Sequence, residues 1–405
     1  MAKQVMQPQE FFDLGMLAGQ VFNPNTPVNE KDLFSGRTIQ IRRVADVVFQ
    51  RGQHALIFGE RGVGKTSLAN VLQGFLPSAR SLLVTRINCD TTDTFTSVWN
   101  KIFDGMNTSK AKVGFGFNND AETQLSIPSL YINDHDNVPH QVYKALAGIP
   151  DEIIPVIIID EFDRLGEDVR PVFADFIKTL SDQSLSATII LIGVGESVDR
   201  LINDHQSVSR ALVQIQMPRM TPQEIEAIIV KSLERLNNMT ISPTTLNKIK
   251  TLAKGLPHYA HLIGLHASRD ALDKMSMKIT DENLTNAITQ ALEDCQHSIR
   301  TSYYNAIRST KSVSLFEDVL LACAIVDVNE LGEFSASDLR MPMQKITGKA
   351  YKIPAYAQHL SEFCDIKRGN ILIKSGQIKK FRYKFSDPLM QPFIIMQGML
   401  NGKTT

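Results

Sequence analysis

Between residues 39 and 217, short continuous apolar runs alternate with segments whose apolar residues recur every three or four positions. The short runs predict buried strands, and the periodic segments predict amphipathic helices. The strands expected are residues 55–58, 81–88, 153–160, 187–192 and 211–217. Because each strand is followed by a helix, the pattern predicts an α/β fold, with a parallel sheet covered by helices on both faces.

After residue 218 the pattern becomes helical. It begins with a capping-box-like pair, Thr221 and Glu224, and predicts further helices at about 244–253, 257–273 and 281–306. Residues 313–400 then predict three helices followed by a two-stranded hairpin, an order typical of a winged helix. These elements are expected at residues 315–326, 335–346, 353–363, 371–374 and 381–385.

A chain of 405 residues is too long for one compact core and suggests several domains. We expect an N-terminal arm, an α/β domain with a hairpin inserted in it, a small helical domain and a winged-helix domain. Their expected bounds are 1–30, 31–218 with the hairpin at 107–137, 219–310 and 311–400.

Charge is balanced overall but not locally. Lys plus Arg and Asp plus Glu each total 43, so net charge predicts no partner. Residues 340–384, however, hold eleven Lys or Arg against only Glu362 and Asp365. This basic stretch favours contact with the phosphate backbone of duplex DNA, although a solvated or protein-binding face would have the same composition.

The cysteines are scattered and include no C-x-x-C pair, which argues against a zinc site or a disulfide framework. They are Cys89, Cys295, Cys323 and Cys364. The N-terminus, MAKQVMQPQE, lacks an apolar signal core, and no apolar run approaches the ~20 residues that span a bilayer. We therefore expect a cytoplasmic protein that does not associate with membranes.

A phosphate-binding loop follows the first predicted strand and precedes a helical pattern. Glycines let successive backbone N–H groups point into one hollow, and the helix N-terminus favours an anion there. Lys65 would reach the β- and γ-phosphates, and Thr66 would bind Mg²⁺. The residues that fit G-x-x-x-x-G-K-[ST], with the following serine, are Gly59, Glu60, Arg61, Gly62, Val63, Gly64, Lys65, Thr66 and Ser67. The alternative is an ordinary glycine-rich turn.

Two acids follow the apolar strand at 153–160. Asp160 would hold a magnesium-bound water, and Glu161 would polarise the attacking water of a hydrolysis reaction. The alternative is that both acids only cap the next helix. With the loop before it, this pair predicts a P-loop NTPase fold that binds ATP and Mg²⁺.

Together, the motifs resemble the origin-recognition and initiator branch of the AAA+ ATPases and the related bacterial STAND-type ATPases. The similarity covers most of residues 31–398. It is carried by LFSGR, GERGVGKTS, IIIDEFDRL, LIGVGES, SVSR before MPRM, GLPHYAHL and FSDPLMQPFIIM. The resemblance implies a five-stranded ATPase sheet, a helical lid over the nucleotide at 219–310 and a winged helix.

The resemblance also implies roles for single arginines. Arg37 would lie near the base or ribose, with a solvated arginine at a helix start as the alternative. Arg210 would be an arginine finger that reaches the γ-phosphate of a neighbouring subunit in a homo-oligomer, or else would form a structural salt bridge. Arg219 is a second candidate for the finger.

Two positions depart from the family pattern. Gly193, Val194 and Gly195 stand where the family has a polar sensor residue, and His258 replaces an arginine that contacts phosphate from the lid. A histidine is mostly neutral at pH 7 and contacts phosphate more weakly. Both departures imply slow hydrolysis.

Three hypotheses follow. The first is a slowly hydrolysing ATPase whose nucleotide state controls assembly on DNA or on a partner protein. The second is a DNA-bound adaptor or loader of the initiator or transposition type. The third is the regulatory ATPase of a bacterial defence system that works with a separate effector protein.

Overall fold

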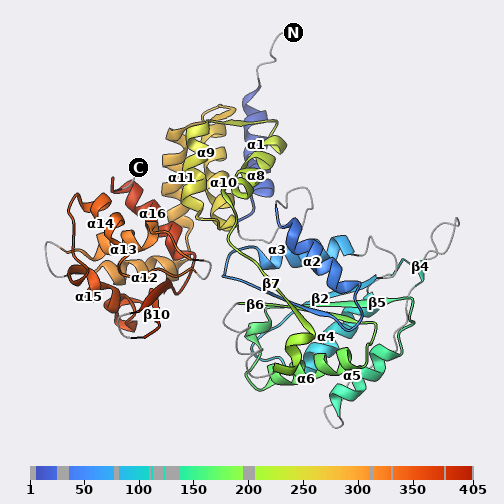
Figure 1. Cartoon of the computed structure of the whole chain (residues 1–405). Helices are drawn as coiled ribbons and strands as arrows, with labels where there is room; N and C mark the ends of the chain where they lie inside the picture. Colours follow the sequence, from blue (N-terminus) through green and yellow to red (C-terminus); the bar gives the residue numbers. More distant parts are fainter. Residues whose placement is uncertain are drawn as a thin grey trace. The chain divides into compact units, whose positions relative to one another are not determined.

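The computed structural model describes residues 6–24, 36–76, 82–108, 111–112, 122–123, 137–194, 206–309, 314–329, 332–377 and 380–403. The chain forms two compact units, and each is described by itself (Figure 1). The sheet unit comprises Pro27–Pro218, and the helical unit comprises Met1–Thr26 with Arg219–Thr405.

The sheet unit contains the five expected strands in one parallel sheet, in the order β2-β5-β6-β1-β7. The strands are β1 (His54–Phe58), β2 (Leu82–Asn88), β5 (Ile154–Asp160), β6 (Thr188–Gly193) and β7 (Leu212–Gln216). Four of the five residues of β1 and all six of β6 are buried, as their apolar sequences require. The predicted α/β P-loop NTPase fold is therefore confirmed.

Helices cover both faces of the sheet. In Figure 1, α2 and α3 lie on one face and α4, α5 and α6 on the other. Their bounds are α2 (Thr38–Val48), α3 (Lys65–Phe75), α4 (Phe95–Thr108), α5 (Val138–Ala147) and α6 (Val169–Asp182). Aromatic rings join α4 to α6: Trp99 is fully buried, and its ring centroid lies 5.3 Å from that of Phe176.

The predicted hairpin at 107–137 is described only in part. Its antiparallel pair consists of β3 (Ala111–Lys112) and β4 (Glu122–Thr123). The rest of this insertion, residues 195–205, and residues 1–5 and 25–30 of the expected arm lie outside the described residues.

In the helical unit, helix α1 packs against α10. The helices of this part are α1 (Pro8–Val21), α8 (Pro222–Arg235), α9 (Pro243–Ala253), α10 (Pro257–Asp273) and α11 (Asp281–Asp294), with a small parallel pair, β8 (Thr240–Ile241) and β9 (Lys278–Ile279). The Thr221–Glu224 capping box at the start of α8 is confirmed.

The single helix expected at 281–306 is wrong. Cys295 and Gln296 have extended backbones, with ψ of 145° and 134°, so α11 ends there and α12 (His297–Ile307) begins. Neither residue is a proline or glycine, and the apolar periodicity continues across the break. The sequence therefore contains no helix-breaking residue that would predict this break.

The C-terminal part of the helical unit has helices and a hairpin in the expected order. Its elements are α13 (Phe316–Ile325), α14 (Arg340–Thr347), α15 (Pro354–Phe363), β10 (Leu372–Ser375), β11 (Arg382–Phe385) and α16 (Met390–Leu400). Strands β10 and β11 pair antiparallel. Helix α16 was not among the predicted elements; most of its residues are buried, as expected of a helix that is apolar all round.

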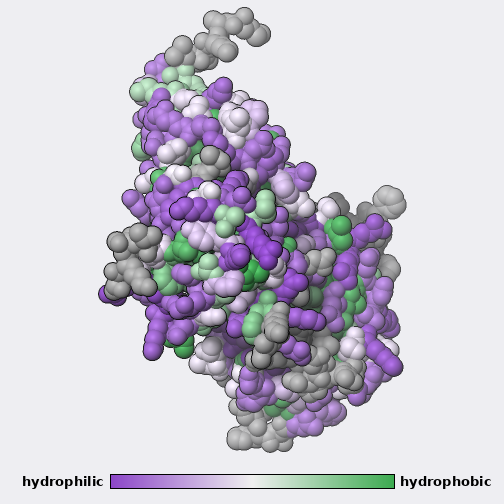
Figure 2. Space-filling model, turned by 60° about the vertical axis from the view of Figure 1, so that its left-hand side comes forward, coloured by the Kyte–Doolittle hydropathy of each residue, from purple (hydrophilic) through white to green (hydrophobic). Residues whose placement is uncertain are grey.

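On the face drawn in Figure 2, hydrophilic side chains predominate, and hydrophobic residues occur in small groups between them. No helix among the described residues is long and apolar enough to cross a membrane.

Candidate nucleotide site

The glycine-rich loop lies between β1 and α3, at the carboxyl end of the central strands. Gly62 and Gly64 have φ of 84° and 94°, a conformation that residues with side chains rarely adopt. Lys65 then begins α3, and Thr66 and Ser67 lie half-buried in its first turn. Strand, loop and helix thus follow one another in the order expected of a phosphate-binding loop.

Lys65 is folded back over the loop. Its Nζ donates to the carbonyl oxygens of Gly59 at 2.9 Å and Glu60 at 2.8 Å. Burial lowers the pKa of Lys65, and the carboxylates of Asp163 and Asp160 act in the opposite direction. The ammonium group therefore lies at the loop among acidic side chains.

Arg37 is tied to the same loop. It is only 3% exposed, and its Nη2 donates to Val63 O at 3.1 Å and to Pro218 O at 2.6 Å. The alternative of a solvated arginine is thus wrong. The left-handed backbone of Arg37, with φ of 63°, sets the start of α2.

Asp160 ends β5 and is buried. Arg86, which no sequence motif singled out, reaches it from the neighbouring strand β2, with Nη2 2.8 Å from Asp160 Oδ2. Arg86 also donates to Asn70 of α3 and to Asn88 of β2. This pair joins the two strands and the helix at the edge where the phosphate loop lies.

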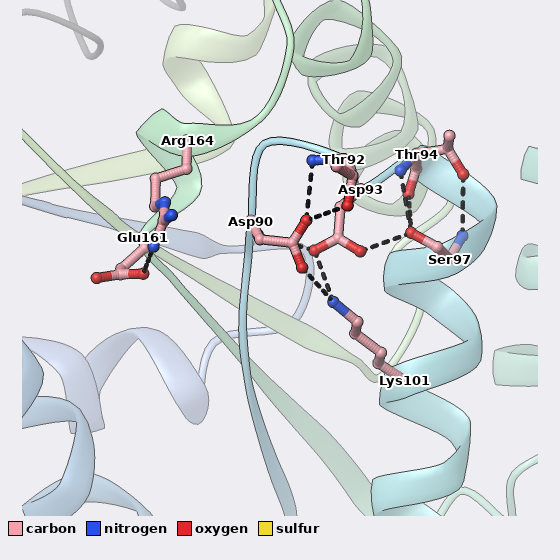
Figure 3. Close-up of polar contacts among 8 residues, drawn as sticks. All are labelled: Asp90, Thr92, Asp93, Thr94, Ser97, Lys101, Glu161 and Arg164. Carbon is pink, nitrogen blue, oxygen red and sulfur yellow. Dashed lines mark hydrogen bonds and ion pairs between the residues drawn. The ribbon is translucent and has the colours of Figure 1, made fainter.

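Glu161 has φ of 55°, and its N–H donates to Asp160 Oδ1 at 2.9 Å. It precedes the short 3₁₀-helix η2 (Phe162–Arg164), but its side chain makes no capping hydrogen bond. Its carboxylate, 46% exposed, pairs instead with Arg164 Nη1 at 3.0 Å (Figure 3). The capping interpretation therefore does not describe Glu161.

Asp163 is the third acid of this segment, and the sequence reasoning missed it. Its Oδ1 accepts from the N–H of Val194 at 3.1 Å and would lie 3.0 Å from a Cβ placed on Gly193. Gly193 pairs in register with Phe58, the residue before the phosphate loop. Asp163 therefore lies against the end of β6, next to the strand that leads into the loop.

Comparison with known proteins agrees with this geometry. Residues 49–202 match the family model described as AAA domain. A comparison with curated protein sequences gave no match.

Solved structures share the fold of nearly the whole chain. The ORC2 protein of Aeropyrum pernix, in ADPNP and ADP complexes, is 12% identical, with a TM-score of 0.53, and the match covers 95% of this chain and 98% of that one. A Walker-type ATPase of Pyrococcus abyssi is 16% identical, with a TM-score of 0.54 and coverage of 92% and 99%. At these identities the likeness shows a common fold.

A polar network follows β2 in the sheet unit (Figure 3). Lys101 of α4 pairs with Asp93 at 2.7 Å and with Asp90 at 3.3 Å. Hydrogen bonds from Thr92 lower the pKa of Asp90 to about 2. The network fixes the turn between β2 and α4 near the edge that carries the acids of β5.

The remaining predicted arginine of the sheet unit, Arg210, ends the 3₁₀-helix η3 (Gln206–Arg210) and is exposed. It makes no salt bridge with any described residue. The salt-bridge alternative therefore finds no support within this part of the chain. Gly193 ends β6 and Val194 follows it, while Gly195 lies outside the described residues.

His258 and Arg219 belong to the helical unit and have partners there. The Nδ1 of His258 donates to Pro24 O at 2.8 Å, which ties the residues after α1 to the start of α10. Arg219 Nη1 donates to Gln391 Oε1 at 2.5 Å, and Gln391 Nε2 donates to Ala324 O. Arg219 thus holds the start of α8 to α16 and α13.

Proposed function

We propose that this chain binds ATP with Mg²⁺ in its AAA domain, hydrolyses it slowly, and uses the nucleotide state to control assembly on a partner. The observation that carries the proposal is the phosphate loop of Gly62 and Gly64, with Lys65 after it and Asp160 at the end of β5, which β6 separates from β1 in the sheet. This arrangement suits a triphosphate with its metal ion. The backbone N–H groups and the ammonium would contact phosphate oxygens, and the carboxylate would face the metal.

Each residue would have one task in ATP binding. The loop backbone, Glu60 to Gly64, would surround the phosphates, and Lys65 would exchange its carbonyl partners for phosphate oxygens. The hydroxyl of Thr66 and the carboxylate of Asp160 would hold Mg²⁺, which neutralises phosphate charge. Arg86 would keep the carboxylate of Asp160 in place. Ser67 would add a hydroxyl in the first turn of α3.

Two acids are candidates to orient the attacking water. Glu161 fits the sequence motif but pairs with Arg164 in an exposed position. Asp163 lies at the end of β6, where the family expectation was a polar side chain, and its carboxylate acts on Lys65. We propose that Asp163 supplies the polar group that Gly193 and Val194 lack and that Glu161 polarises the water after leaving Arg164.

The test is ATP binding by the full chain, measured by calorimetry with Mg²⁺. The Lys65→Ala variant should lose about tenfold or more in affinity, because it removes a charge-assisted contact to phosphate. The control is Lys144→Ala, an exposed lysine on α5, which should bind ATP like the original chain. Unchanged affinity in Lys65→Ala would contradict the proposal.

Assembly would use the exposed Arg210 as a finger that contacts the γ-phosphate bound by another copy of the chain. A guanidinium that no described side chain neutralises is suited to this task. We propose that the AAA domain, a helical lid and a winged helix form the working protein. Its ATP-bound form would be a homo-oligomer, and this form would bind a partner or effector protein.

Duplex DNA is the second candidate partner, favoured by exposed lysines in the basic stretch. They are Lys345, Lys349, Lys352, Lys367, Lys374 and Lys380. Arg368 is not available, because it pairs with Glu362, donates to Ala306 O and lies over the ring of Phe316. Affinity for duplex DNA should fall steeply as salt rises, since each phosphate contact releases counterions. Weak binding even at low salt would exclude this role.

A further inference from the structure

A cavity of about 710 Å³ lies within the helical unit, and none of its lining residues belongs to the proposed nucleotide site. One wall comes from α9, and the others come from the end of α13, from α14 and from α16. Its volume falls within the range of ordinary small-molecule sites, about 300 to 1,000 Å³. The segments that form it are far apart in the sequence.

The walls are mainly apolar. Leu252 and Ile395 are buried, whereas the side chain of Met341 is 73% exposed at the opening. Met399 contributes a second thioether. Methionine side chains are flexible and polarisable, so such walls can adapt to an apolar ligand. A ligand bound in the cavity would bury the exposed apolar surface of this methionine, which favours binding.

All charged side chains among the described residues of the lining are cationic: Lys248, Lys254 and Lys345. Lys248 already pairs with Asp281 at 2.9 Å. Lys345 is exposed, and no salt bridge joins it or Lys254 to a described acid. The cavity thus has two ammonium groups with no paired carboxylate.

Lys254 is held at the cavity by its backbone. Lys254 is half-buried and caps α9 in the left-handed conformation, with φ of 47°. Among the described residues, its Nζ donates to Ile325 O, at 3.3 Å. Burial lowers the pKa of Lys254, and Arg219 lowers it further, while Asp327 acts in the opposite direction. A half-buried ammonium without a paired anion costs free energy, which an anionic ligand would recover.

We propose that this cavity binds a small amphipathic anion, an apolar body that carries one carboxylate or phosphate group. The anionic group contacts Lys254 and Lys345, and the apolar body lies against Leu252, Met341 and Ile395. The proposal goes beyond nucleotide binding and does not depend on it, because none of these residues belongs to the AAA domain.

Ligand binding would link two parts of the helical unit. Helix α9 belongs to the segment expected to form the lid, and α14 and α16 belong to the segment expected to form the winged helix. A molecule that contacts both walls stabilises their packing by mass action. The full chain should therefore resist unfolding more strongly when the ligand is present.

The experiment is calorimetric titration of the full chain with three probes that share a ten-carbon chain: decanoate, decyl phosphate and decyltrimethylammonium, each below its micelle concentration. We expect one molecule of either anion to bind per chain and no binding of the cation. Lys254→Met and Lys345→Met, which keep an apolar stem, should each weaken anion binding by about tenfold.

Two further variants keep the test clear if Lys254→Met folds poorly. Met341→Asp places a negative charge at an exposed position of the wall and should weaken decanoate binding. Lys349→Met removes an exposed charge just after α14 but outside the lining, and it should bind decanoate like the original chain. Absence of anion binding, equal binding of the cation, or equal losses in Lys345→Met and Lys349→Met would overturn the proposal.

Discussion

Among single residues, the three acids that follow β5 differ in their surroundings. Asp160 is buried against Arg86, Glu161 is paired with Arg164, and Asp163 accepts a backbone N–H from the end of β6. The motif predicted the first two because their spacing after a buried strand is characteristic. It could not reveal Arg86 or Asp163, because their importance arises from pairing between strands that are distant in the sequence.

Asp163→Asn tests whether this third acid takes part in hydrolysis. The amide oxygen can still accept from Val194, so the fold should remain, but the negative charge is lost. We expect ATP hydrolysis to fall by about a hundredfold with ATP affinity kept, since orienting or polarising groups contribute effects of that size. Single-turnover hydrolysis and calorimetric binding measure the two quantities separately.

The control for this variant is Asp182→Asn, which removes an exposed carboxylate at the end of α6. It should hydrolyse ATP at the original rate. Equal rates in Asp163→Asn and the original chain would exclude a role for Asp163 and leave Glu161 as the only acid for the water.

Among elements, those with strong periodicity and clear punctuation were predicted well, including the five strands and α8 with its capping box. The break between α11 and α12 and the helix α16 were not predicted. The break was missed because no proline or glycine marks it. Helix α16 was missed because it is apolar on all sides and lacks the pattern of an amphipathic surface helix. Packing of α1 on α10 could not be derived either, since it joins segments more than 200 residues apart.

Gly264→Ala tests the packing of α1 on α10. A Cβ at Gly264 would lie 2.4 Å from the ring of Phe22, so the ring and α1 must move. We expect a loss of about 1 to 3 kcal/mol in the stability of the helical unit and faster proteolysis of α1. The control is Gly15→Ala within α1, where a Cβ meets nothing within 4 Å. Equal proteolysis of both variants would contradict this packing.

At the scale of the whole molecule, each unit has a buried histidine that couples its stability to pH. Burial lowers the pKa of His54, the first residue of β1, and that of His261, on α10, to about 4 from an ordinary value of 6.5. The unfolded chain therefore binds more protons between these values. The contribution of each neutral histidine to the free energy of unfolding is fully present above pH 6.5, and it is lost as pH falls toward 4.

We expect the sheet unit to lose about 2 kcal/mol of stability between pH 7 and pH 4.5 through His54. The only tryptophan, Trp99, lies in this unit, so its fluorescence during urea unfolding measures the loss there. In His54→Asn the amide oxygen can accept the Ile189 N–H that His54 Nδ1 accepts at 3.0 Å, without titrating in this range. That variant should show a weaker pH dependence, and an unchanged dependence would contradict the assignment to His54.

The sequence predicted the α/β sheet of the sheet unit and most helices of the other unit, because local patterns determine them. It did not predict which residues group into the two compact units, because that depends on contacts between distant segments. The roles of DNA, of an effector protein and of Arg210 remain predictions for the same reason.

Sedimentation velocity of the Glu161→Gln chain with Mg²⁺ and ATP, ADP or no nucleotide tests nucleotide-controlled assembly most directly. Because this variant should hold ATP unhydrolysed, we expect a larger species with ATP than with ADP or without nucleotide. Adding Arg210→Ala should abolish that increase. Identical sedimentation coefficients in all three nucleotide states, with ATP shown to be bound, would contradict the account.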